Sequence, residues 1–318
     1  MDSPSLNQFC ARRCPSNCST ASGIGAILLW STTFAFARSL SEKVGPLTAG
    51  AAVYLIGGAF CLFRLSWLGK PIARSLKLPR LYLIGCGSLF VFYTAALYLA
   101  VGLARNREQL LEIALVNYLW PALTVLFSLL LLKKRGSLWL IPGTALALSG
   151  VFLVMTQNVS VSWASMWEHL QSNPAAYSLA LAAAISWALY SNLTRRWSEP
   201  ESSGAVELFL LATGFVLLGL RLMVNEPTGW SFGAIGEAAG LAAVTGLSYA
   251  LWDLAMRKGN LLLVAACSYF TPLLSTVVSC LYLKVSPGPN LWIGCLLLVS
   301  GSLITWRSVS DRPVPTKV

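Results

Sequence analysis

Two prolines lie near the middle of long apolar segments, where they change the chemistry of the backbone. Pro121 and Pro272 lack the N–H that would bond to the carbonyl group four residues earlier, so they free the carbonyl groups of Asn117 and Ser268. In lipid such groups must find another partner or line a wet cavity. Together with the polar side chains of Asn117 and Ser268, they could hold an ammonium group. The alternative is an ordinary kink bridged by a neighbouring Ser or Thr.

Aromatic side chains are concentrated in the same apolar segments, several of them far from the segment ends where membrane-belt residues lie. A tyrosine hydroxyl or an indole N–H at that depth needs a partner, which a cavity wall or helix packing can supply. As a set they predict a pocket that is mainly apolar with a few polar groups. The predicted substrate-cavity residues are Trp30, Tyr93, Tyr98, Asn117, Tyr118, Trp120, Trp187, Tyr190, Tyr249, Trp252, Ser268 and Tyr269, and the predicted hinges are Pro121 and Pro272.

Three carboxylates lie inside the apolar segments and could bind a coupling proton or form ion pairs. Asp253 precedes Arg257 by four residues, the spacing of an ion pair along one helix. Glu112 could pair with Arg105 or Arg107. The third is Glu207. No chain of ionisable residues crosses the membrane, so the sequence leaves proton coupling and plain ion pairing both open.

The sequence has few of the residue patterns that metal binding, cofactor binding or enzyme catalysis would need. Cys10, Cys14 and Cys18 have regular spacing, but a metal site there would need a fourth ligand and none is near. The single histidine excludes an H-E-x-x-H zinc protease, and only one aspartate falls in an apolar segment. We therefore expect no metal, no cofactor and no enzymatic activity, and we take the three cysteines to be reduced thiols in a tail.

The composition requires lipid as the solvent for most of the chain. Of 318 residues 56% are hydrophobic and 11% are charged, whereas soluble domains carry about 25% charged residues. Runs of about 20 apolar residues predict an all-α polytopic membrane protein embedded in the lipid bilayer. The ten predicted spans are 21–40, 46–67, 80–104, 108–132, 137–157, 175–195, 204–224, 236–256, 260–283 and 289–307.

The net charge of +11 reflects topology rather than nucleic-acid binding. Most of the 23 Lys and Arg residues fall on one set of alternate connections and on the two tails, 1–20 and 308–318, which places both termini in the cytoplasm. The outer connection 158–174 has no Lys or Arg. Trp163, Met166, Trp167 and Leu170 recur there with helical spacing, which predicts an amphipathic helix on the outer interface with His169 facing water.

The two halves of the chain resemble each other. Trp30 corresponds to Trp187 at an offset of 157, and the segment 117–121 corresponds to 268–272 at an offset of 151. Each half has five spans, so the second half, 175–307, enters the membrane from the side opposite to the first half, 21–157. This predicts two inverted five-helix repeats around a central cavity. Small residues in the fifth and tenth spans would allow close helix contact, within a monomer or across a homodimer, and include Gly143, Gly150, Gly294 and Gly301.

The run Asn117-Tyr118-Leu119-Trp120-Pro121, the segment around Trp30 and the five-plus-five repeat resemble the EamA family of the drug/metabolite transporter superfamily. The resemblance covers about residues 21–308, and it departs from the motif in the second half, which has Ser268-Tyr269-Phe270-Thr271-Pro272. It implies ten helices in a basket, with the cavity lined by helices 1, 3, 4, 6, 8 and 9. It also implies location in a bacterial inner membrane and export of aromatic and other neutral amino acids by alternating access. The alternative is an exporter of drugs or other metabolites with the same fold.

Overall fold

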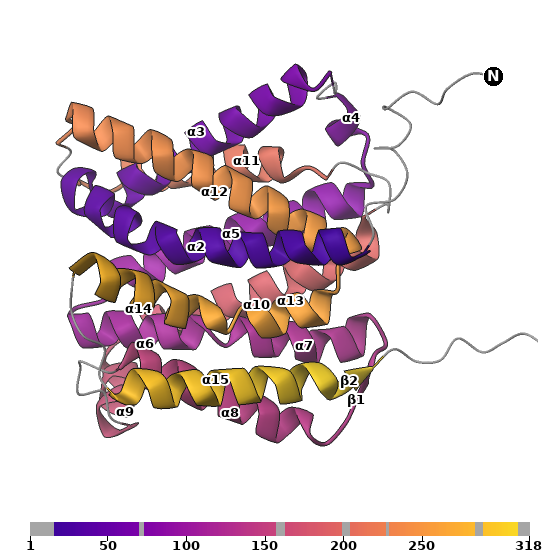
Figure 1. Ribbon diagram of the computed structural model, residues 1–318. Coiled ribbons are helices and arrows are strands. Elements are labelled where there is room, and N and C mark those ends of the chain that lie inside the picture. The colour runs from indigo at the N-terminus through magenta and orange to yellow at the C-terminus, as the bar shows by residue number, and fades with distance from the viewer. Residues whose placement is uncertain are drawn as a thin grey trace, which may run out of the picture.

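A computed structural model describes residues 16–69, 73–156, 163–198, 204–226, 229–283 and 289–310. Cys10, Cys14 and most of the two tails lie outside these ranges. The described chain is almost entirely helical, with one short antiparallel strand pair (Figure 1). Its elements are α2 (Ser16–Val44), α3 (Pro46–Trp67), α4 (Ala73–Leu76), the π-helix η1 (Leu81–Cys86), α5 (Gly87–Gly102), α6 (Arg107–Asn117), α7 (Trp120–Leu131), β1 (Arg135–Gly136), α8 (Leu140–Met155), α9 (Trp163–Ser172), α10 (Pro174–Trp197), α11 (Val206–Leu222), α12 (Phe232–Lys258), α13 (Leu261–Cys267), α14 (Phe270–Leu283), α15 (Pro289–Arg307) and β2 (Val309–Ser310).

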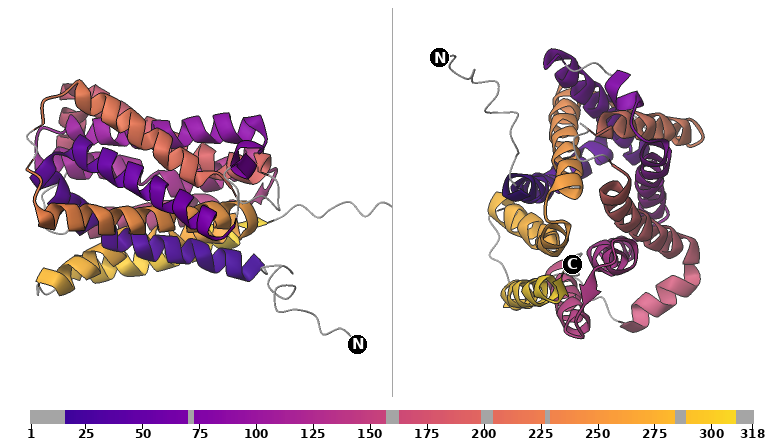
Figure 2. Two further views of the ribbon diagram at one scale, coloured as in Figure 1. Left: turned by 90° about the horizontal axis from the view of Figure 1, so that it is seen from above. Right: turned by 90° about the vertical axis from the view of Figure 1, so that its right-hand side faces the viewer.

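The long helices lie side by side along one direction, so the bundle has two ends (Figures 1 and 2). We name each end after a residue that lies there. The Arg257 end carries the start of α2, the helix α4, the end of α12 and the β1–β2 pair, on the right in Figure 1. The Glu226 end carries the end of α2, the helix α9 and the start of α12, on the left.

Several helices are long and apolar enough to cross a membrane. In the described residues these are α3, Leu81–Gly102, Arg107–Leu131, α12 and α15, together with a pair, Leu261–Cys267 and Phe270–Val278, bent by 41°. This gives a multi-pass membrane protein with five or six candidate spans, fewer than the ten predicted. The remaining long helices fall short for local reasons, since α8 has 16 residues and α11 has 17.

Polar residues account for the low hydropathy of α10, and they are buried. The hydroxyl group of Ser186 donates to the carbonyl of Leu89 on α5 at 2.8 Å. The amide of Asn192 donates to the carbonyl of Thr124 on α7 at 2.9 Å. In a bilayer such bonds hold helices together where hydrophobic burial cannot. Hydropathy alone therefore does not identify α10 as a candidate span, although α10 lies at the centre of the bundle.

The pairing of helices relates the two halves. α2 packs along α12 and α5 packs along α10, while α3 pairs with α11, α7 with α13, and α8 with α15. If α2, α3, α5 and α8 are exchanged with α10, α11, α12 and α15 respectively, these four pairs (α2–α12, α5–α10, α3–α11 and α8–α15) are unchanged. Most of the packing therefore joins the first half to the second.

The small residues of the fifth and tenth predicted spans meet inside one chain. A Cβ added to Gly150 of α8 would lie 2.7 Å from the carbonyl oxygen of Gly294 on α15. One added to Gly301 would collide with the backbone of Ala147. The absence of side chains lets the two backbones touch along most of their length. This places the close contact within the monomer rather than between two copies.

Replacing Gly150 by valine is expected to destabilise the bundle, because the two backbones would have to separate. Overpacking of this kind costs about 1–3 kcal/mol. A thermal unfolding curve of the purified protein should show a lower midpoint. Gly240 on α12 has open space around it, so Gly240→Val is the matched control. An equal effect of both substitutions would contradict the role assigned to the α8–α15 contact.

Candidate substrate site

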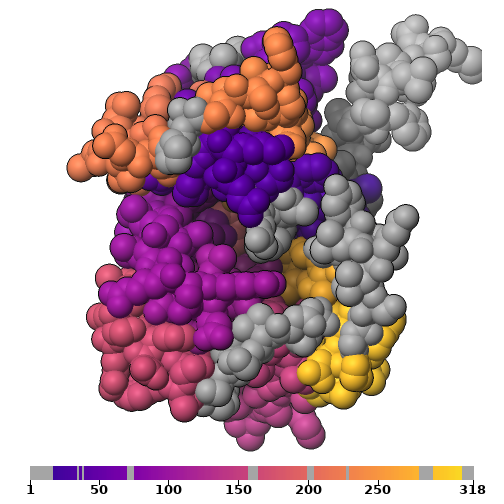
Figure 3. Space-filling view, turned by 90° about the vertical axis from the view of Figure 1, so that its left-hand side faces the viewer, coloured from indigo at the N-terminus to yellow at the C-terminus, as the bar shows by residue number. Residues whose placement is uncertain are grey.

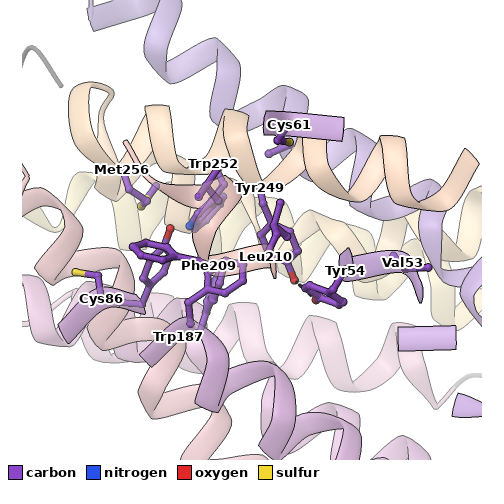
Figure 4. Close-up of a cluster of buried hydrophobic side chains, with 14 of the residues drawn as sticks. Val53, Tyr54, Cys61, Cys86, Trp187, Phe209, Leu210, Tyr249, Trp252 and Met256 are labelled. Carbon is purple, nitrogen blue, oxygen red and sulfur yellow. Dashed lines mark hydrogen bonds between the residues drawn. The ribbon is translucent and has the colours of Figure 1, made fainter. Parts of the chain in front are cut away.

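Aromatic side chains from five elements meet in the middle of the bundle. We call this group the central aromatic cluster; it consists of Trp30, Phe90, Tyr93, Trp120, Trp187, Tyr190, Tyr249 and Trp252. Trp187 is its hub, with ring centroids 4.7 Å from Tyr93 and 5.9 Å from Trp252, which it stacks on. Figure 4 shows Trp187, Tyr249 and Trp252 converging from opposite sides of the bundle. Trp187, Tyr190 and Trp252 are almost fully buried.

The cluster is most deeply buried around Trp187 and less deeply buried around Trp30 and Tyr93. Trp30, Tyr93 and Tyr98 are half-buried although each belongs to a helix that packs on both sides. Tyr93 contacts Trp187 and its hydroxyl group interacts with the side chain of Asn117, so its exposed part faces the interior. Figure 3 looks onto the Glu226 end and shows it hollowed at its centre.

Tyrosine hydroxyl groups supply the polar part of this wall. The hydroxyl groups of Tyr54 and Tyr249 are hydrogen-bonded at 2.8 Å (Figure 4). Tyr98 lies near Tyr54, and Tyr93 lies near Tyr118. Tyr54 and Phe90 were missed by the sequence reasoning, although both are aromatic residues in the middle of apolar segments, the signal that identified the others.

The two proline segments have different local structures. The first is interrupted at Tyr118 and Leu119, between α6 and α7, yet runs on as one span. The second is interrupted at Ser268 and Tyr269, between α13 and α14, and bends by 41°. Each interruption lies just before a proline.

The expectation of a free carbonyl group at Ser268 is wrong. The N–H of Thr271 donates to that oxygen at 3.1 Å, which closes a tight turn. The Ser268 hydroxyl group donates to the carbonyl of Ala265 at 2.6 Å, so it is also used within the segment. In contrast, the side-chain oxygen of Asn117 is buried with no hydrogen-bond partner among the described residues. Buried polar atoms without a partner among the described residues therefore occur at both interruptions, namely the Asn117 oxygen in the first half and the hydroxyl groups of Tyr269 and Thr271 in the second.

Tyr269 lies apart from the central aromatic cluster. It is fully buried against α8 and α15, beside Val151 and Leu298. Tyr118, its counterpart in the first half, packs partly against the same group. These two tyrosines thus lie between the broken segments and the α8–α15 pair, whereas the other predicted aromatic residues, Trp30, Tyr93, Trp120, Trp187, Tyr190, Tyr249 and Trp252, surround the centre.

Buried charged and polar side chains are paired at the Arg257 end. The guanidinium group of Arg257 donates to the carboxylate of Asp253 at 2.7 Å, with both side chains nearly inaccessible. The hydroxyl group of Tyr82 on η1 donates to the other Asp253 oxygen at 2.9 Å. Glu207 accepts a hydrogen bond of 2.6 Å from Ser75 on α4. These bonds join α4 to α11 and η1 to α12 at the Arg257 end.

Gly204 brings the backbone against this network. Its φ of 80° is in the left-handed region, and a Cβ there would collide with the Asp253 carboxylate. Neither Tyr82 nor Gly204 was identified from the sequence. A tyrosine at the start of an apolar segment looks like a membrane-belt residue, and only the fold brings it to Asp253.

Glu112 pairs with residues that the sequence did not suggest. Its carboxylate lies 3.0 Å and 3.1 Å from Nδ1 of His169, and it accepts a hydrogen bond from the Tyr177 hydroxyl group. The expected partners were Arg105 and Arg107. The prediction that His169 faces water is wrong, since its side chain is 17% exposed and turned towards α6. A helix in this connection was predicted, and α9 is that helix, but its residue His169 points inward towards α6.

Metal-binding residues do not gather in the described part of the chain, where no group of three His, Cys, Asp or Glu lies together. Cys18 is exposed on α2. The remaining candidates for chemistry are therefore the aromatic wall, the Asn117 side chain and the carboxylates.

Comparison with known proteins identifies similar chains. Three curated relatives named aromatic amino acid exporter YddG are similar over nearly their whole lengths. The one from Escherichia coli (strain K12) is 32% identical over 90% of this chain and 96% of its own. Those from Salmonella typhimurium (strain 14028s / SGSC 2262) and Ancylobacter novellus are 31% and 32% identical, covering 92% and 90% of this chain. A solved crystal structure has a TM-score of 0.76 at 28% identity, over 90% of this chain and 96% of its own.

The sequence pattern described as the EamA-like transporter family matches residues 20–156 and again residues 174–307. The two matches together cover most of the chain, and the family and the relatives are transporters rather than enzymes. The chain belongs to the EamA-like transporter family.

Proposed function

We propose that this protein exports aromatic and other neutral amino acids across a bacterial inner membrane. The central aromatic cluster is the observation that carries the proposal. Its rings offer broad apolar contact to an aromatic side chain, and the Asn117 oxygen and the Tyr93 hydroxyl offer polar contacts to a backbone ammonium or carboxylate group. The names of the three relatives support the same substrate class.

The proposed architecture has ten spans in two inverted repeats, with both termini in the cytoplasm. The two family matches and the exchangeable helix pairs support the repeat. Under this topology the Arg257 end is cytoplasmic and the Glu226 end faces outward. The described state is then open outward and closed inward by the Asp253–Arg257 network.

Transport by alternating access requires the Glu226 end to close and the Arg257 end to open. We assign the bending to the two broken segments before Pro121 and Pro272, because an interrupted helix has fewer backbone hydrogen bonds to lose. Glu207 and Asp253 lie where the Arg257 end must part, and Glu112 lies at the opposite end. Any of the three could change its protonation during the cycle.

Transport is best tested in proteoliposomes loaded with labelled tryptophan, phenylalanine or alanine. We expect release above that of empty liposomes for neutral amino acids and little release of glutamate, because the cluster has few fixed charges. No release of any amino acid would overturn the proposal. Release of labelled drugs that amino acids do not compete with would favour the alternative, an exporter of drugs or other metabolites.

A further inference from the structure

Glu112 is fully buried near the Glu226 end and lies outside the aromatic wall. Its two oxygens face Nδ1 of His169 on α9, at 3.0 Å and 3.1 Å, and one of them accepts a hydrogen bond from the Tyr177 hydroxyl group on α10. Three elements therefore meet at one carboxylate. A buried carboxylate needs such partners, because an unpaired charge in an apolar interior is very costly.

The charge of this cluster depends on one side chain. Elements α5, α8, α9 and α10 pack against α6. Their side chains bring no Lys or Arg to Glu112, and the α6 neighbours Glu108 and Gln109 do not neutralise it. The other titratable or charged groups in this region are Glu168 on α9, Tyr177 on α10, Tyr93 and Tyr98 on α5, and Arg105 and Arg107 at the start of α6. Among the described residues, His169 is the one side chain in contact with Glu112 that can supply a positive charge, and it does so when its imidazole is protonated.

Glu112, His169 and Tyr177 lie beside α6, which is the outer half of the first broken segment, α6–α7. Glu112 lies on α6, six residues before the interruption that begins at Tyr118, and α6 packs against α10, so a bend at the interruption would move α6 relative to α10. A second contact reinforces the attachment, because the amide of Asn173 donates to the carbonyl of Leu103 at 2.9 Å and to Gln109 at 3.2 Å. His169 is 17% exposed, so water can deliver a proton to it.

We propose that Glu112, His169 and Tyr177 form a proton-operated latch that holds α9 and α10 against the outer half of the fourth span. A proton on His169 creates an ion pair with Glu112 and closes the latch. Loss of that proton leaves hydrogen bonds from His169 and Tyr177 to a carboxylate that no longer faces a cation, which loosens the latch. Histidine is the side chain that ordinarily changes charge between pH 5 and 8, so the latch is expected to depend on the pH at the Glu226 end. The consequence for transport rests on the proposed function, but the latch itself does not.

The latch is tested on purified, tag-free protein by hydrogen–deuterium exchange of the amides of 163–172, with intrinsic exchange rates corrected for pH. We expect these amides to be about fivefold better protected at about pH 6 than at about pH 8.5, the effect of an ion pair worth about 1 kcal/mol. His169→Gln should abolish the pH dependence. His169→Lys, which keeps a positive charge throughout, should give high protection at both values. Glu168→Gln, a change at an exposed carboxylate on the same helix, should behave as the wild type.

Two outcomes would overturn the latch, namely unchanged pH dependence in His169→Gln, or equal protection at both pH values in the wild type. Whether the latch limits the motion needed for transport is tested by measuring transport with equal pH on both sides of the liposome membrane. Faster transport at about pH 8.5 than at about pH 6 should disappear in both His169 variants. A pH profile that persists in them would overturn the link. Failure of the wild type to transport any amino acid would instead count against the proposed function, and the exchange result would still decide the latch.

Discussion

Replacing Trp187 by alanine is expected to lower both stability and transport more than any other single aromatic substitution. Its indole contacts seven other rings of the central aromatic cluster: Trp30, Phe90, Tyr93, Trp120, Tyr190, Tyr249 and Trp252. Burying a large aromatic side chain in a soluble core contributes about 3–5 kcal/mol. In a bilayer the transfer contribution is weaker because lipid tails are also apolar, but the cavity and the lost ring contacts remain. We therefore expect a loss of about 3 kcal/mol.

The two effects of Trp187→Ala can be separated by measuring the unfolding midpoint and the initial rate of tryptophan release. Trp187→Phe should recover most of the stability and part of the transport, because it restores a ring at the hub. Trp292→Ala is the matched control, since that indole is 61% exposed on α15 and should change neither quantity. If Trp187→Ala transports at the wild-type rate, the central aromatic cluster does not form the substrate path.

The sequence predicted the aromatic site better than the polar one. Mid-span position marks a tryptophan or tyrosine as internal, because lipid-facing aromatic residues are favoured at the membrane surface. The tryptophans that this criterion selected, Trp30, Trp120, Trp187 and Trp252, are neighbours in space, while their role in lining a substrate cavity stays a prediction. It failed for Tyr269, which is internal but packs against α8 and α15. Depth in the bilayer can be read from a sequence, whereas the direction in which an internal side chain points depends on the neighbouring helices.

The repeat also misled the prediction at one position. Equivalent prolines suggested equivalent carbonyl groups at Asn117 and Ser268, yet the turn at Ser268 closes on Thr271 and bends the chain by 41°. Trp120 stands in the first half where Thr271 stands in the second. A difference in one side chain is accompanied by a different turn, so the two corresponding segments have different backbone structures. A comparison of residue types does not show which carbonyl groups are hydrogen-bonded.

Contacts between distant segments could not be predicted at all. Sequence spacing predicted Asp253 and Arg257 as neighbours because they are four residues apart on a helix. The partners of Glu112 are 57 and 65 positions away, on α9 and α10. Local reasoning offered the nearby arginines instead, because spacing along the chain contains no information about which connection folds back over α6.

Removing one member of the Asp253–Arg257 pair is expected to produce the second large effect. Arg257→Gln leaves a buried carboxylate with hydrogen bonds from Tyr82 but no cation, and such a loss costs about 3–5 kcal/mol. Asp253→Asn leaves a buried guanidinium group and should cost a similar amount. The double variant leaves neither charge, so it should be clearly more stable than the sum of the single changes predicts, with a coupling of about 2–3 kcal/mol.

Thermal unfolding of the wild type, the two single variants and the double variant gives this coupling directly. The matched control is the pair Lys43–Glu237 at the other end of the bundle, 2.5 Å apart but with side chains 42% and 26% exposed, where removal of either partner should change the midpoint little. If the Asp253 and Arg257 effects simply add, the pair does not hold the Arg257 end closed. If they couple, the double variant also tests the gate. It should be folded and yet transport poorly, because a weakened closure lets substrate escape towards both sides instead of being carried from one side to the other.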